Sequence, residues 1–208
     1  MDRATGESIS LPEPQRDGGM SVWRAIAERR SRRSFAPDSL SLQTIGTVCW
    51  AVQGVTDESD GFRAAPSAGA TYPLSVVVVV GSDGVPQLDA GVYRYDPGDH
   101  TLTQRVAGDR RADLRAACND QSWIEAAPVT LILAADPDRT ARQYGDRGRD
   151  RYVPVEVGHA GQNLYLAAEA LDLGTVVVGA FDDEAVARLV DMPAEEIPMA
   201  VYPIGTPR

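Results

Sequence analysis

Apolar residues recur in two patterns along this chain of 208 residues. In several segments they are spaced three and four residues apart, which is typical of one face of a helix, and each of these segments but one follows a Ser or Asp suited to an N-cap. Elsewhere they form short continuous runs, such as the β-branched run at 75–80, which predict buried strands. The predicted helices are 22–27 after Ser21, 42–52 after Ser41, 110–117 after Asp109, 155–173 with Gly174 as its C-cap, and 183–190 after Asp182. The predicted strands are 75–80, 91–96, 101–106, 129–134, 176–178 and 199–205.

Helices and strands therefore interleave, which predicts an α/β or α+β sandwich. Residues 91–106 are expected to form a hairpin with His100 in its turn, and 139–151 a mobile loop or short helices. We expect residues 1–20 to be an N-terminal arm, partly disordered or wrapped around a partner, and residues 21–208 to be a single domain.

The amino-acid composition excludes several classes of partner and of catalytic mechanism. The net charge of −10 argues against nucleic acid or a membrane surface as partner, and the absence of lysine excludes Schiff-base catalysis. Cys49 lies on an apolar helix face and is predicted to be a core residue. We see no metal-ligand spacing, no signal peptide and no apolar run long enough to span a bilayer, so a cytoplasmic location is expected.

Four of the arginines fall within residues 29–33, followed by Ser34 and Phe35. Arginine forks match the oxygens of a phosphate, and the Ser31 hydroxyl would add a donor, so the segment is a candidate anion site. The alternative is a solvated helix end, where cations are favoured in any case.

Two further motifs combine small residues with turns. Residues 65–74, Ala-Pro-Ser-Ala-Gly-Ala-Thr-Tyr-Pro-Leu, would let a backbone approach a flat ligand, or would form an ordinary loop. Residues 156–166 carry Gly158 and Gly161, which suggest close helix–helix contact, and His159, which we expect to be a core histidine. Gly179 and Ala180 offer backbone N–H groups at the turn after a strand.

Together these motifs resemble the nitroreductase superfamily, and most closely its SagB-type dehydrogenase branch, from about Ser21 to the C-terminus. Residues 91–97, 121–124 and 179–183 also carry the resemblance. It implies an α+β sandwich whose central sheet is mixed and mainly antiparallel, flanked by helices, in an obligate homodimer with two FMN sites at the subunit interface.

The resemblance also implies site residues. Arg29 and Ser31 would hold the flavin phosphate, with Arg30 beside them more tolerant of change, and Arg33 would face the pyrimidine end. The cofactor contacts expected from the remaining motifs are Pro66, Ser67, Ala68 and Gly69 of the partner subunit, Asn119, Gln121 and Ser122, and Val178, Gly179 and Ala180, with Arg208 as a further candidate at the phosphate. Gly179 and Ala180 would present an N–H to flavin N5.

One departure concerns the Lys-Tyr pair of azoline oxidases in this branch. The matching residues here are Gln143 and Tyr144, so only the tyrosine is present, and we expect it near the substrate. The function expected is ping-pong hydride transfer through FMN from NAD(P)H to a small organic acceptor. The alternatives are a dehydrogenase that oxidises a peptide-derived or heterocyclic substrate with oxygen as acceptor, and a flavin-binding protein without turnover.

Overall fold

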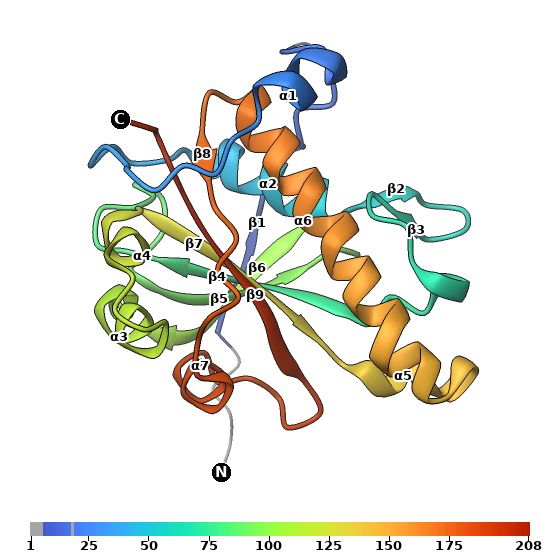
Figure 1. Ribbon diagram of the computed structural model, residues 1–208. Helices are drawn as coiled ribbons and strands as arrows, with labels where there is room; N and C mark the ends of the chain where they lie inside the picture. The colour runs from blue at the N-terminus through green and yellow to red at the C-terminus, as the bar shows by residue number, and fades with distance from the viewer. Residues whose placement is uncertain (1–5, 18) are drawn as a thin grey trace.

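A computed structural model describes residues 6–17 and 19–208. Its centre is a seven-stranded sheet in the order β1-β6-β5-β4-β7-β9-β8 (Figure 1). Each pairing between neighbouring strands is antiparallel, while a parallel bridge joins Ser31 to Thr175. The expected mainly antiparallel sheet is therefore confirmed. The strands are β1 (Ser8–Ser10), β4 (Leu74–Val80), β5 (Gly91–Asp96), β6 (Thr101–Ala107), β7 (Val129–Ala135), β8 (Gly174–Thr175) and β9 (Ile197–Gly205), with β2 (Val55–Asp57) and β3 (Phe62–Arg63) forming a separate hairpin.

Helices cover both faces of the sheet, as the α+β sandwich requires (Figure 1). One face packs against α2 and α6, and the other against α3, α4 and α7. The helices are α1 (Val22–Glu28), α2 (Leu42–Gln53), α3 (Arg111–Ala117), α4 (Ser122–Ala126), α5 (Pro137–Tyr144), α6 (Val153–Ala170) and α7 (Asp183–Leu189), with a 3-10 turn η1 (Ala68–Ala70) and a π-helical turn η2 (Gly148–Tyr152). No helix in the described residues is both long and apolar enough to cross a membrane.

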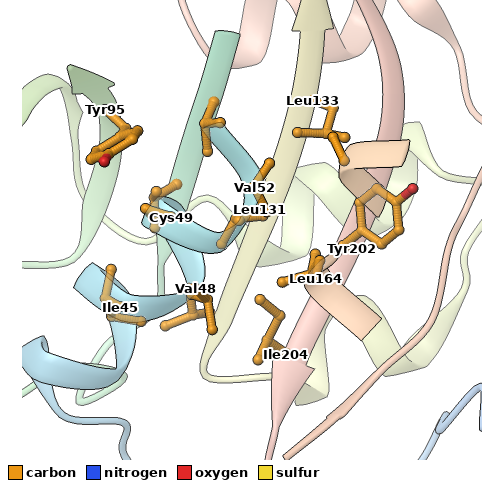
Figure 2. Close-up of a cluster of buried hydrophobic side chains, with 14 of the residues drawn as sticks. Ile45, Val48, Cys49, Val52, Tyr95, Leu131, Leu133, Leu164, Tyr202 and Ile204 are labelled. Atoms are coloured by element: carbon orange, nitrogen blue, oxygen red, sulfur yellow. The ribbon is translucent and has the colours of Figure 1, made fainter. Parts of the chain in front are cut away.

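The larger core lies between the sheet and the pair α2 and α6 (Figure 2). Val48, Cys49 and Val52 project from α2 onto Leu131 of the central strand β7. Cys49 is thus a core residue, as predicted, and burial raises the pKa of its thiol far above the ordinary value. A thiol held in that state is a poor nucleophile.

The extended arm is part of the sheet in its own chain. Residues 8–10 pair with β6, and Leu11 is buried. His100, in the hairpin turn as predicted, holds the arm in place: its two ring nitrogens lie 2.9 Å from the Tyr95 hydroxyl and 3.0 Å from the Pro12 carbonyl. Residues 1–5 and 18 of the predicted arm lie outside the described residues.

Several predicted element boundaries are wrong. Asp109 is not the N-cap of α3, because its carboxylate is used by the Ser82 amide and by the Arg111 side chain, and Arg110 holds the cap position. Gly174 does not cap α6, which ends at Ala170 with Leu171 as its C-cap; Gly174 opens strand β8 instead. Of the predicted strand 176–178, only Val178 pairs, through a bridge to Val201. The segment 139–151 forms short helices, one of the two alternatives.

The face of α6 that packs on the sheet is not the one that carries Val155, His159 and Gln162. Val155, His159 and Gln162 are exposed, while Glu156, Ala160 and Gly161 are buried. The physical reason is the fit to strand β9: a Cβ atom at Gly161 would come within 2.2 Å of the Tyr202 hydroxyl, so only glycine fits there. Gly161 therefore serves packing inside the subunit, whereas a Cβ at Gly158 would meet nothing within 4 Å.

Candidate active site

The arginine segment, residues 29–33, follows α1 and runs beside the C-terminal half of α6. The Arg29 guanidinium carbon lies 5.2 Å from the centre of the Tyr165 ring, a cation–π distance. Arg33 lies in the same way over Trp123, at 5.7 Å. Neither arginine has an acidic partner among the described residues, although the chain carries 30 acidic residues. Their positive charge is therefore available to an anion.

A chain of hydrogen bonds fixes Ser31 next to Arg29. The Val177 amide donates to the Tyr165 hydroxyl oxygen at 2.9 Å, and that hydroxyl lies 2.9 Å from Ser31 Oγ. Because Tyr165 already accepts one bond, it can donate its own proton to Ser31. The exposed Ser31 hydroxyl then keeps its proton for an outside acceptor.

The other basic residues near this segment have different surroundings. Arg30 donates to the carbonyls of Ala27 and Arg29, so it caps the end of its own helix. Arg32 pairs with Glu169 at 3.6 Å. The backbone N–H of Arg208 donates to the Ser34 carbonyl, which brings residue 208 beside the arginine segment.

The turn at Gly179 and Ala180 is held from both sides. Val178 before it is buried and exchanges two backbone bonds with Val201. The side-chain amides of Asn119 and Gln121 donate to the Ala180 carbonyl at 3.2 and 3.1 Å. Within the described residues neither the Gly179 nor the Ala180 N–H has an acceptor, and both residues are exposed. The turn thus presents two fixed donors to solvent, with Ser122 exposed at the start of nearby α4.

The small-residue loop, residues 66–69, packs against Tyr144 rather than against the arginine segment. A Cβ at Gly69, whose φ is +59°, would lie 2.5 Å from the Tyr144 hydroxyl. The Thr71 hydroxyl lies 2.8 Å from that of Thr140 on α5, the helix that carries Tyr144. The Tyr144 ring in turn meets Tyr152 edge to face, at 5.2 Å between centres.

Beside this loop opens a cavity of about 250 Å³. It is lined by the following residues: Pro66, Ser67, Ala68, Tyr152, Val155, Glu156 and His159. The expectation that His159 is a core histidine is wrong: the side chain is exposed at this cavity, because α6 is rotated so that Glu156 and Ala160 face inward. Burial raises the pKa of Glu156 to about 7, against the opposing influence of the Ser67 hydroxyl and the Arg63 guanidinium.

The predicted residues thus form two groups at opposite ends of α6. The arginine segment and the Gly179 turn lie towards its C-terminal end, and the small-residue loop and Tyr144 towards its N-terminal end (Figure 1). Between Glu156 and Tyr165 the helix rises about 14 Å. A single chain therefore brings together the residues within each group but not the two groups.

Three residues of these groups were missed by sequence reasoning. Tyr165 was assigned only to a helix face, yet it connects Arg29 with Ser31. Tyr152 and Glu156 come just before the glycine-containing part of the helix. Glu156 is an acid among the valines at 153, 155 and 157, and this is the sequence signal that could have marked it as a site residue. Its burial could not be deduced, because valines at alternate positions do not define a helix face.

Comparison with known proteins places these features in a family. Residues 26–206 match the model of the family described as Nitroreductase family. A protein of Methanocaldococcus jannaschii named as a nitroreductase is 42% identical over 197 residues, which cover 95% of both chains. The trifolitoxin operon protein TfxC of Rhizobium leguminosarum is 22% identical over 98% of this chain and 60% of its own length.

Solved structures agree. A crystal structure named as a nitroreductase of Ralstonia eutropha superposes with a TM-score of 0.84 at 29% identity, over 97% of this chain and 90% of the other. A chain of the Escherichia coli microcin synthetase McbBCD complex shares the fold, with a TM-score of 0.76 at 23% identity, over 93% and 75% of the two chains. The family match spans nearly the whole described fold and both groups of site residues, and the chain belongs to the nitroreductase family.

Proposed function

We propose that this protein is an FMN-dependent oxidoreductase that passes a hydride equivalent from NAD(P)H to a small organic acceptor in a ping-pong cycle. We further propose that it works as a homodimer with two sites, each built from two chains. The observation that carries the proposal is the division of the site: one chain holds an anion-binding group and a flat, small-residue group at opposite ends of α6. Members of the family are typically flavin-dependent oxidoreductases.

The arginine segment fits the phosphate of FMN. Arg29 and the Ser31 hydroxyl are adjacent through Tyr165, and neither is used by an acidic side chain within the described residues. A charge-assisted bond from guanidinium to phosphate is among the strongest that a protein makes. Arg33 and Arg208 add positive charge nearby, whereas Arg30 is committed to its own helix end.

The Gly179 turn fits the reactive edge of the isoalloxazine. Its two N–H groups have no acceptor among the described residues, and Asn119 and Gln121 fix the turn by donating to the Ala180 carbonyl. When bound, the flavin supplies the hydride chemistry, and these backbone donors orient and polarise it without titrating. Tyr144 and residues 66–69 of the partner subunit would cover the other side of the ring.

The experiment that tests both parts is complementation between two inactive variants. Arg29→Ala removes the phosphate contact, and Ala68→Trp fills the flat surface of the small-residue loop. In a mixed dimer one site carries both changes and the other carries neither. We expect each variant alone to bind FMN much more weakly than the wild type. Their mixture, after unfolding and refolding together, should regain up to one tightly bound FMN per mixed dimer.

A site built within one chain predicts the opposite result, since each site would then carry one of the two changes. No recovery of FMN in mixed dimers that mass spectrometry confirms would therefore contradict the shared site. Wild-type protein refolded in parallel controls for losses on handling.

A second candidate function is oxidation of a peptide-derived heterocycle, with oxygen as acceptor. The observation that favours it is the similarity to the trifolitoxin operon protein and to a chain of the microcin synthetase complex. Because Gln143 has no titratable proton, we expect thiazoline oxidation to be weak and quinone or nitroaromatic reduction to be nearly unchanged in Tyr144→Phe. Robust wild-type thiazoline oxidation that is lost in Tyr144→Phe would promote this second function.

A flavin-binding protein without turnover is the third alternative. Rapid bleaching of the bound flavin by NADH or NADPH would support the reductase. Absence of bleaching by either nucleotide or by a heterocyclic peptide would support a flavin-binding protein without turnover. A cytoplasmic location remains a prediction.

A further inference from the structure

Glu156 is a buried acid that the cofactor residues leave unused. Its side chain is on α6, and the residue is 2% exposed. Its Oε1 atom has no hydrogen-bond partner among the described residues. Buried carboxyl oxygens are normally hydrogen-bonded, so an unsatisfied one calls for a structural or functional explanation.

A cavity lies next to this buried residue. Glu156 lines the cavity of about 250 Å³ formed with the small-residue loop. Among the described residues lining that cavity it is the one carboxylic acid, and the neighbouring side chains of Val155, Pro66 and Ala68 are apolar. A group bound in the cavity would therefore meet one buried carboxyl in otherwise largely apolar surroundings.

The charged and titratable groups around Glu156 leave it free to change protonation state. Burial favours the acid, and the Ser67 hydroxyl and the Arg63 guanidinium of β3 favour the carboxylate less strongly. The Arg63 guanidinium itself interacts with Tyr72, Tyr95 and Arg139. Tyr152 and His159 are the other titratable residues that line the cavity with Glu156. None of them forms an ion pair with Glu156. The balance raises its pKa to about 7, so near neutral pH it can both give and take a proton.

We propose that Glu156 donates the proton that accompanies hydride transfer to a quinone-type acceptor bound in this cavity. The proposal rests on the oxidoreductase function above. Reduction of a quinone to a hydroquinone adds two electrons and two protons, and a hydride brings both electrons but one proton. The Glu156 O–H gives the second proton to a quinone oxygen, whose C=O double bond becomes C–O–H, and the carboxylate recovers a proton from water.

The test compares acceptors that do and do not need this proton. The FMN-loaded dimer is reduced and its reoxidation is followed by stopped flow, once with a benzoquinone and once with ferricyanide, which takes electrons alone. Glu156→Gln keeps the size of the side chain and removes its acidity. We expect Glu156→Gln to slow quinone reduction by about 10²-fold or more and to change ferricyanide reduction by less than about twofold.

A second measurement does not depend on turnover. The infrared band of a protonated carboxyl should titrate near neutral pH in the wild type and be missing in Glu156→Gln. Glu184→Gln, an exposed acid on α7, is the matched control and should behave as the wild type in both measurements. Thermal unfolding checks that each variant is folded.

Four results would overturn the proposal. Unchanged quinone reduction in Glu156→Gln, with normal ferricyanide reduction, removes the proton role alone. An equal loss with both acceptors shows that Glu156 serves cofactor binding or folding instead, and a loss in His159→Gln but not in Glu156→Gln transfers the role to the histidine. A wild type that neither binds FMN nor reduces ferricyanide overturns the proposed function, and the proton role with it.

Discussion

At the scale of single residues, the arginine segment shows how one sequence motif divides into different tasks. Arg29 and Arg33 lie over aromatic rings, Arg30 bonds to carbonyls at the end of α1, and Arg32 pairs with Glu169. Four similar side chains therefore differ in what they can offer a ligand.

This division predicts a difference in FMN affinity. Removing one charge-assisted bond costs about 1.5–3 kcal/mol, so Arg29→Ala should weaken FMN binding by about 10- to 150-fold. Arg30→Ala keeps the segment basic but removes a side chain that is used elsewhere, and it should change the Kd by less than about threefold. Fluorescence titration of the apoprotein measures both. Equal losses in the two variants would mean that only the net charge matters.

A second prediction at this scale concerns how Glu156 makes the stability of the protein depend on pH. Its folded-state pKa of about 7 is above the ordinary value of 4.5, so the folded protein binds a proton more tightly than the unfolded chain. Stability from this group is complete below the unfolded pKa and is lost as the pH rises through the folded one. The loss amounts to about 1–3 kcal/mol.

Glu156→Gln should remove that dependence. The free energy of unfolding, measured by urea titration from about pH 5 to about pH 8, should fall less steeply with pH in the variant than in the wild type. Parallel curves for the two proteins would show that Glu156 is ionised in the folded state.

At the scale of elements, α6 is the part of the structure that organises the site. Its C-terminal half carries Tyr165, which connects Arg29 with Ser31, and its N-terminal half lines the cavity beside the small-residue loop. The helix can do both because small residues let it lie close to β9, where Gly161 meets the Tyr202 ring.

Substitution of the two glycines of α6 should therefore have unequal effects. Gly161→Ala places a methyl group 2.2 Å from the Tyr202 hydroxyl and should cost about 1–3 kcal/mol through overpacking. Gly158→Ala meets nothing within 4 Å and should cost less, or stabilise the helix by up to about 1 kcal/mol. Chemical denaturation of both variants checks the order, and a larger loss at Gly158 would indicate that a second chain covers that face.

At the scale of the whole molecule, apolar side chains are exposed beside the arginine segment. Trp23 is 80% exposed on α1, and Val22, Ile26 and Val177 are also exposed large hydrophobic residues. Isolated exposed apolar residues are common, but several near one end of α6 fit the proposed dimer.

A charge on this surface should dissociate the dimer. We expect Trp23→Glu to shift the protein towards monomer in light scattering and to release FMN, because half of each proposed site comes from the other chain. Ile197→Glu adds the same charge at an exposed apolar residue at the start of β9 and is the control. Monomeric wild type with FMN bound would contradict the dimer outright.

The sequence by itself predicted the fold class, the inner strands of the sheet and most of the longer helices, but not β1, α4 or the hairpin of β2 and β3. The apolar runs at 75–80 and 129–134 form inner strands of the sheet, and Cys49 is buried, because local sequence pattern reports burial when an element is clearly apolar. Ser21, Ser41 and Asp182 capped helices as expected, since a cap depends on nearby residues alone.

Only the tertiary structure decided which face of α6 is buried and which residues, distant in sequence, meet at its two ends. Valines at 153, 155 and 157 left the buried face undefined, and packing against Tyr202 selected the one that buries Glu156 and exposes His159. The contact between Tyr144 and Gly69, 75 residues apart, and the one between Arg29 and Tyr165 arise from chain segments distant in sequence. Such contacts follow from how the layers pack, which no local pattern specifies.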